Sequence, residues 1–306
     1  MNIVLFGSTD VTLAVADFLS NESHQIGAIV TVSETFSISY KPDGVKNSRF
    51  VDMVAWGKEK GIPVIIYKNT DQTISDLKNL GISLDFAIVV GWFHMIQKKL
   101  RDLFFSGCAG FHASLLPQLR GGAPLNWAIL LNLRETGVSF FEFSDGVDDG
   151  PLYAQEKFSI RDGDYIGDLI KKSEKSIIKM LGYTLPQIKR NHSLKHPQKG
   201  APSYCGQRVP EDSQIDWNDP AKNILRLIRA SSAPYPGAYS FLDTEKVIIW
   251  KAETSKIEVY GIPGQILIAD GIHIACKEGA VTLREYQSNF QIEKSNHKKL
   301  RFLHGY

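Results

Sequence analysis

Residues 84–90 read LDFAIVV, an almost unbroken apolar run with the length of one β-strand. Such a run is typical of a strand in a parallel sheet whose two faces are both covered by helices. It predicts a central strand of an α/β domain. The segments on either side of it have the lengths and patterns that complete such a sheet.

Towards the N-terminus, short apolar strands alternate with stretches of helical spacing. Strands are expected at 2–6, 25–32 and 62–66, and helices at 11–19, 51–60 and 70–80. The polar stretch 34–50, with a turn at 42–44, is predicted to be a long loop. The alternation favours a doubly wound, Rossmann-like and mostly parallel sheet, which binds its ligands beyond the carboxyl ends of the strands.

Towards the C-terminus, the alternation of strands and helices continues and is then followed by a series of short strands. Further strands are expected at 107–111, 138–143 and 151–158, and helices at 125–132 and 164–188. After a polar, aperiodic stretch comes a helix at 220–230 and a series of short strands, which predict a small all-β, OB-like barrel. The predicted division is an α/β domain over 1–188, a linker over 189–207 and a C-terminal β-rich domain over 208–306.

Composition argues against a disordered chain, a membrane-spanning protein and a framework held together by disulfides or metal. With 306 residues, 43% hydrophobic and 22% charged, the chain has ordinary globular usage. Its 35 Lys+Arg against 33 Asp+Glu do not make nucleic acid or an anionic membrane the default partner. No apolar run reaches transmembrane length, and no signal peptide is expected. Three scattered cysteines, Cys108, Cys205 and Cys276, favour neither disulfides nor a metal site, so a reducing, cytoplasmic location is expected.

Two segments concentrate side chains that carry chemistry. Residues 110–129, GFHASLLPQLRGGAPLNWAI, place His112 and several polar residues in a predicted loop. Residues 136–150, TGVSFFEFSDGVDDG, end a strand with three aspartates, among them Asp148. A His and an Asp that meet in a cleft form a general-base pair. The alternative is that these residues only form turns.

The spacing of these residues resembles a known family. HxSLLPxxRGxxPxxWAI over 112–129, followed by ETGV at 135–138 and DDG at 148–150, is similar to the 10-formyltetrahydrofolate-dependent formyltransferases. QRVPEDSQIDW over 207–217 resembles an element shared by methionyl-tRNA formyltransferases and the formyltransferase half of the aminoarabinose-modifying enzyme. The resemblance covers nearly the whole chain. It implies formyl transfer from 10-formyltetrahydrofolate to a primary amine, with His112 as base assisted by Asp148 and no metal.

One position departs from the family pattern, because Gly110 stands where the family has Asn. The Asn would donate to the oxyanion of the tetrahedral intermediate, and losing one such donor typically costs about 10²–10³ in rate. Three alternatives follow. Another donor replaces the Asn, protonated His112 stabilises the oxyanion alone, or the protein binds folate or sugar nucleotide with weak or no turnover. An active enzyme is favoured, since His112, Asp148 and the rest of the loop are present.

The remaining predicted site residues fall into two groups. The resemblance implies a pterin pocket, whose wall is expected to be formed by Gly91, Trp92, Phe93, Met95, Asp145, Ser114 and Leu116. Contacts to the acceptor are assigned to Tyr40, Lys41, Lys46, Arg120, Pro124 and Trp127.

The charge of the C-terminal residues bears on which acceptor the protein uses. Residues 208–306 carry 13 Lys+Arg against 12 Asp+Glu, which is not the basic footprint of an RNA-binding domain. In addition, GAPLNW at 122–127 resembles the aminoarabinose-modifying enzyme. This resemblance, together with the charge balance, implies that the acceptor is a nucleotide-linked amino sugar destined for a surface polysaccharide. Initiator methionyl-tRNA is the alternative, and a homodimer is left open.

Overall fold

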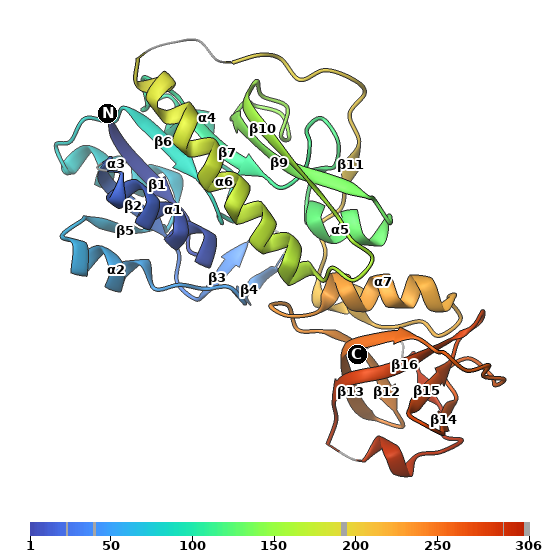
Figure 1. Ribbon diagram of the computed structural model, residues 1–306. Helices are drawn as coiled ribbons and strands as arrows, with labels where there is room; N and C mark the ends of the chain where they lie inside the picture. Colours follow the sequence, from blue (N-terminus) through green and yellow to red (C-terminus); the bar gives the residue numbers. More distant parts are fainter. Residues whose placement is uncertain (23, 39–40, 191–194, 290, 303–306) are drawn as a thin grey trace. The chain divides into compact units, whose positions relative to one another are not determined.

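The computed structural model describes residues 1–22, 24–38, 41–190, 195–289 and 291–302 (Figure 1). The chain folds into two compact units, each made of three segments. The first contains 1–121, 136–158 and 171–204, and the second contains 122–135, 159–170 and 205–306. The predicted boundaries at 188, 189–207 and 208 stay a prediction.

The first unit is built on a seven-stranded sheet with the order β10-β9-β7-β6-β1-β2-β5. Its strands are β1 (Asn2–Phe6), β2 (Gln25–Thr31), β5 (Val64–Ile66), β6 (Phe86–Val89), β7 (Cys108–His112), β9 (Glu135–Glu142) and β10 (Leu152–Ser159). The pairs β1–β2, β1–β6, β2–β5 and β6–β7 are parallel, and β7–β9 is antiparallel. The predicted mostly parallel, doubly wound sheet is confirmed.

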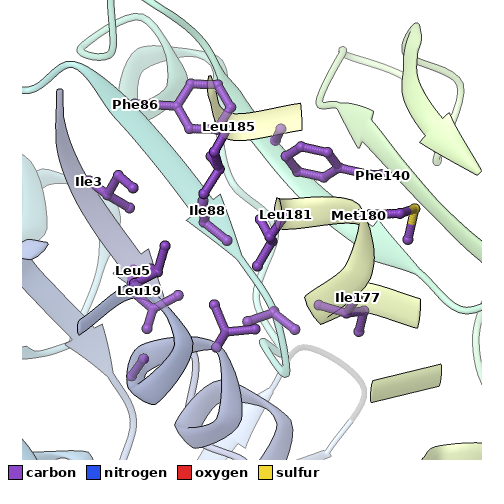
Figure 2. Packing of buried hydrophobic residues seen from close by; sticks show 14 of the residues in the cluster. Ile3, Leu5, Leu19, Phe86, Ile88, Phe140, Ile177, Met180, Leu181 and Leu185 are labelled. Carbon is purple, nitrogen blue, oxygen red and sulfur yellow. The ribbon is translucent and has the colours of Figure 1, made fainter. Parts of the chain in front are cut away.

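Helices cover both faces of this sheet, which explains the continuous apolar run at 84–90. They are α1 (Asp10–Asn21), α2 (Met53–Lys60), α3 (Thr70–Asn79), α4 (Lys98–Arg101) and α6 (Ile166–Lys189). Because successive strand side chains alternate between faces, Ile3 and Leu5 of β1 join one buried cluster, and Val4 and Phe6 join another. Figure 2 shows the first cluster, where Leu181 and Leu185 of α6 pack over Phe86 and Ile88.

The stretch 34–50 corrects a prediction. It is not a long loop, because β3 (Thr35–Ile38) and β4 (Lys41–Lys46) pair antiparallel within it. The expected turn at 42–44 lies inside β4 rather than at a chain reversal. Tertiary packing accounts for the hairpin: Ile38 is buried, and the Phe36 ring lies 4.9 Å from that of Phe93. A strand of four residues carries too little pattern to show this in the sequence.

The second unit is rich in antiparallel strands, as predicted. A six-stranded sheet has the order β14-β15-β16-β13-β12-β17. Its strands are β12 (Ala238–Leu242), β13 (Glu245–Thr254), β14 (Ile266–Ile268), β15 (Ile272–Ala275), β16 (Ala280–Gln287) and β17 (Leu300–Arg301). Helices α5 (Pro124–Leu130) and α7 (Ala221–Ser231) and the 3-10 turns Pro210–Ser213 and Ile292–Lys294 belong to the same unit. Ile224 and Ile228 of α7 pack into the sheet's core.

Two short strands, β8 (Arg120–Gly121) and β11 (Tyr204–Cys205), form a further small ladder. Among the residues that the structure describes, no helix combines the length and apolar character needed to cross a bilayer.

Candidate active site

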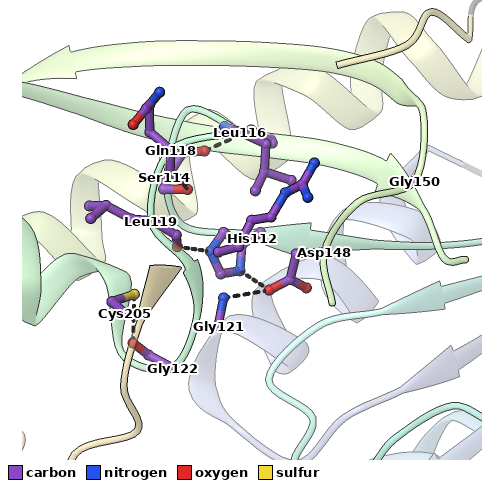
Figure 3. A network of polar contacts seen from close by, with 12 residues as sticks. His112, Ser114, Leu116, Gln118, Leu119, Gly121, Gly122, Asp148, Gly150 and Cys205 are labelled. Carbon is purple, nitrogen blue, oxygen red and sulfur yellow. Dashed lines mark hydrogen bonds and ion pairs between the residues drawn. The ribbon is translucent and has the colours of Figure 1, made fainter. Parts of the chain in front are cut away.

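His112 is the last residue of β7, in the middle of the first unit's sheet, in register with Ser139 of β9. Its side chain is buried and lies between two acceptors (Figure 3). Nε2 is 2.6 Å from the carbonyl oxygen of Leu119, and Nδ1 is 3.4 Å from Oδ2 of Asp148. The structure thus brings together the two side chains that the sequence paired.

The partners of the His112 ring assign its protons. A carbonyl oxygen only accepts, so Nε2 must carry the proton that bonds to Leu119. This main-chain carbonyl, rather than the Asp148 carboxylate, fixes the tautomer. Nδ1 is then the ring nitrogen able to take up a proton, and the neighbouring Asp148 carboxylate stabilises the imidazolium that results.

Asp148 sits in a tight loop with φ +49°, a left-handed conformation that is uncommon for a residue with a side chain. Its Oδ2 also accepts a hydrogen bond from the main-chain N–H of Gly121, at 2.8 Å. Gly150 allows the loop to return to β9, because a Cβ there would lie 1.8 Å from the Glu142 carbonyl oxygen. Sequence reasoning missed Leu119 and Gly121, since main-chain groups leave no side-chain signature.

Position 110 has no room for the family's Asn. A Cβ on Gly110 would lie 2.5 Å from Cζ of Phe143 and 2.9 Å from the carbonyl oxygen of Val89. The Phe143 ring therefore fills the space into which a side chain at 110 would project. The departure is thus a matched pair of residues, a glycine on β7 and a phenylalanine just after β9.

The segment after β6 lies at the carboxyl edge of the parallel strands, where ligands bind in such sheets. Gly91 has φ +63°, and its missing Cβ makes room for Thr9, whose Oγ1 would lie 2.0 Å from that atom. The close contact with Thr9, at the start of α1, explains why a glycine stands at this position. The place of Gly91 in the wall of a pterin pocket stays a prediction. Phe93 and Met95 are 40% and 70% exposed, and offer apolar surface.

An aromatic cluster surrounds this segment. It consists of Phe36 from the hairpin, Tyr67 after β5, and Trp92, Phe93 and His94 after β6. The Tyr67 and His94 rings are 4.6 Å apart, and Trp92 meets Tyr67 edge-on at 5.3 Å. Burial lowers the pKa of His94, so its neutral form is favoured in the fold. Phe36 and Tyr67 were not predicted, because each lies in a different segment of the sequence.

Three predicted cofactor contacts are engaged within the protein. Asp145 is exposed and forms an ion pair with Arg101. The Ser114 hydroxyl is buried and donates to the carbonyl of Gln118 at 2.5 Å. Leu116 is buried in a small apolar group with Phe141 and Leu152. Their contact with a folate stays a prediction.

The predicted acceptor contacts are spread over both units. Lys46 is exposed and forms an ion pair with Glu34, with Nζ 3.2 Å from Oε1. Arg120 donates to Oε1 of Gln198 through Nε and Nη2. Pro124 and Trp127 lie in the second unit, where Pro124 begins α5 and the Trp127 indole donates to the carbonyl of Gly206 at 2.9 Å.

The two other residues of this group are less defined. Lys41 begins β4, and only its main chain is described. Tyr40 lies outside the described residues.

Within the described ranges, no group of three or more His, Cys, Asp or Glu side chains is arranged to hold a metal ion.

Comparisons with known proteins cover both halves of the chain. Residues 1–182 match the family described as "Formyl transferase", and residues 208–295 match "Formyl transferase, C-terminal domain". The chain is also 30% identical over 285 residues to the methionyl-tRNA formyltransferase of Thermodesulfovibrio yellowstonii, with 92% of this chain and 89% of that protein covered.

Solved structures share the fold at low identity. An N-formyltransferase from Helicobacter canadensis, in complex with folinic acid and dTDP-3-aminofucose, has a TM-score of 0.68 at 15% identity, covering 93% of this chain and 99% of its own. A variant of HypX from Aquifex aeolicus has a TM-score of 0.69 at 19% identity over 95% of this chain, which spans 45% of HypX. With both family matches and the 30% identical relative, the chain belongs to the formyl transferase family and is a formyl-transferring enzyme.

Proposed function

We propose that this enzyme transfers a formyl group from 10-formyltetrahydrofolate to the primary amine of a nucleotide-linked amino sugar. The observation that carries the proposal is the His112–Asp148 pair, in which Leu119 fixes one ring nitrogen and the other faces a carboxylate. A base held in one tautomer beside a stabilising carboxylate is what proton transfer from an attacking amine requires.

The proposed reaction has two steps. As the amine nitrogen bonds to the formyl carbon, Nδ1 of His112 accepts the proton that the nitrogen loses, and Asp148 stabilises the imidazolium. When the bond between the formyl carbon and N10 of the folate breaks, His112 returns the proton to N10. The products are a formamide and tetrahydrofolate, and His112 is neutral again.

The oxyanion of the intermediate needs a donor. Position 110 offers no side chain, and Phe143 fills the adjacent space. Both N–H groups of a protonated His112 are directed at the Leu119 carbonyl and the Asp148 carboxylate. We therefore assign the stabilisation to the positive charge of the imidazolium, which is present at the moment when the oxyanion exists, and not to a hydrogen bond from its ring. This is the second of the three alternatives that Gly110 left open, and it matches the electrostatic requirement of the transition state.

Charge around the hairpin supports a small acceptor. Lys46 is paired with Glu34, and Arg49 with Asp10, so these cations are already neutralised. A tRNA needs many unpaired cations on its phosphates, whereas a nucleoside diphosphate needs two or three. Phe36 of the hairpin, which is half-buried beside the predicted pterin-pocket residue Phe93, offers a ring on which a base can stack.

Methionyl-tRNA is the second candidate, and two observations favour it. The 30% identical relative that covers 92% of this chain has that activity. In addition, residues 208–306 have a small net charge, but their cations are unevenly distributed. The C-terminal segment is basic and contains Lys294, Lys298, Lys299 and Arg301. None of these four forms an ion pair with a residue that the structure describes.

A transfer assay followed by mass spectrometry tests the proposal. The protein and 10-formyltetrahydrofolate are mixed with a panel of UDP-, dTDP- and GDP-linked amino sugars, and with methionylated initiator tRNA in parallel. We expect one sugar to gain a formyl group, and His112→Ala to slow that transfer by about 10²–10⁴ because the base is lost. Formylation of the tRNA alone would reverse the choice of acceptor. Folate binding without any transfer would favour the non-catalytic alternative, and an unchanged rate in His112→Ala would refute the assignment of the base.

A further inference from the structure

The stretch predicted as a linker lies against the candidate active site. We call residues 196–204 the strap; all belong to the first unit. His196 exchanges two main-chain hydrogen bonds with Leu152 of β10, at 2.8 and 3.0 Å. Gln198 is partly buried, whereas Pro197 and Lys199 on either side are exposed. The strap therefore directs the Gln198 side chain inward.

The Gln198 amide connects the two loops of the site. Its Nε2 donates to the carbonyl oxygens of Asp148 and Gly150, both at 2.8 Å. Its Oε1 accepts from Nε and Nη2 of Arg120, at 3.2 and 2.6 Å. Both N–H groups and both lone pairs of the amide are thus used, which fixes the side chain in one orientation. The loop that bears Asp148 is clamped to the loop that follows His112.

The other end of the strap holds the opposite side of the imidazole. The Ser203 hydroxyl accepts from the N–H of Leu119 at 2.9 Å and donates to Oε1 of Gln118, also at 2.9 Å. The Ser203 carbonyl accepts from the N–H of Arg120 at 2.9 Å. These bonds position Leu119, whose carbonyl bonds to Nε2 of His112.

Backbone strain explains why the site needs such a support. Leu119 and Asp148 have φ +55° and φ +49°, although neither is a glycine. Residues persist in this region when surrounding contacts determine their conformation. The strap bonds directly to the main chain of both residues. Leu119 and Asp148 contact the two ring nitrogens of His112. A change in the position of the strap would therefore change the orientation of the His112 ring.

We propose that Gln198 is a positioning residue for formyl transfer, which holds the Asp148 carboxylate against Nδ1 of His112. This inference rests on the proposed function, in which that pair moves the proton. Misplacing a reacting group by about 1 Å costs up to about 10² in rate, so an effect on kcat is expected from a residue that touches no reacting atom.

Gln198→Glu is the sharpest variant. It keeps the size of the side chain but replaces the two N–H donors with an oxygen that faces two carbonyl oxygens. Lys199→Ala is the matched control, because Lys199 is the exposed neighbour and bonds to no described residue. We expect Gln198→Glu to lower kcat at least about tenfold while KM for the folate changes less than about threefold. Tm measurements confirm that both variants are folded, and a kcat within twofold of the parent overturns the inference.

A second readout needs no acceptor. In protein with ¹⁵N-labelled histidine, the ring signals of His112 are identified by their loss in His112→Ala. We expect Gln198→Glu to shift the Nδ1 signal, and Lys199→Ala to leave it in place. Unchanged His112 signals in Gln198→Glu overturn the inference even if no acceptor is found. If His112→Ala keeps the transfer rate, the proposed function fails; if it is inactive while Gln198→Glu is normal, only this inference fails.

Discussion

At the scale of single residues, the glycine at position 110 is explained by the ring of Phe143, which fills the space that a side chain at 110 would need. We expect Gly110→Asn to destabilise the fold by about 1–3 kcal/mol, the usual cost of overpacking a filled site. The new side chain would meet both the Phe143 ring and the Val89 carbonyl, and the latter is main chain of the neighbouring strand β6. Urea unfolding of the variant and the parent measures the difference.

The control for this prediction is the double variant Gly110→Asn with Phe143→Ala. Removing the ring relieves the contact at 2.5 Å but leaves the contact of 2.9 Å with Val89. Part of the lost stability should return relative to Gly110→Asn alone. If Gly110→Asn is as stable as the parent, the ring is free to swing aside and does not explain the glycine.

At the scale of elements, the β3–β4 hairpin is attached to the sheet's edge through His94. Its ring lies 5.6 Å from Phe36 and 4.6 Å from Tyr67, and burial lowers its pKa. Below about pH 6.5 the unfolded chain therefore binds more protons at this residue than the folded chain does, so stability falls as pH falls through that value.

We therefore expect the parent protein to lose more stability between pH 7.5 and pH 5.5 than His94→Phe, which keeps an aromatic ring but cannot titrate. Unfolding midpoints at the two pH values measure the effect. His24, whose pKa is also lowered by burial, titrates in both proteins and cancels in the difference. Equal losses in the two proteins would show that His94 is not the group responsible.

The same scale shows what a sequence can and cannot predict. The run at 84–90 contains β6, and it could be predicted because a strand buried on both faces has a continuous apolar pattern and the run has the length of a strand. The hairpin was missed because its pairing depends on Phe36 meeting Phe93, which lies on a distant segment. His112 and Asp148 carry side-chain chemistry and could be predicted as a pair. Leu119 contacts the ring through its main-chain carbonyl and Gln198 lies in an aperiodic polar stretch, so neither could be predicted.

At the scale of the whole molecule, the distribution of charge matters more than its sum. The chain's net charge is +2, and two cations, Lys46 at the end of the hairpin and Arg49 just after it, are paired with carboxylates. The C-terminal segment differs, because residues 294–306 contain no Asp or Glu. A polyanionic acceptor would use these cations, whereas a nucleotide-linked sugar is too small to need them.

Reversing two exposed charges in that segment separates the acceptors. We expect Lys298→Glu with Lys299→Glu to leave formylation of an amino sugar within twofold of the parent, with little dependence on salt. Were methionyl-tRNA the acceptor, kcat/KM would fall, and the log–log slope of binding against salt would shrink by about 0.7–0.9 for each phosphate that the variant no longer neutralises. Steady-state rates at several salt concentrations measure both quantities. A large loss of activity in this variant would therefore contradict the amino-sugar proposal without touching the His112–Asp148 chemistry.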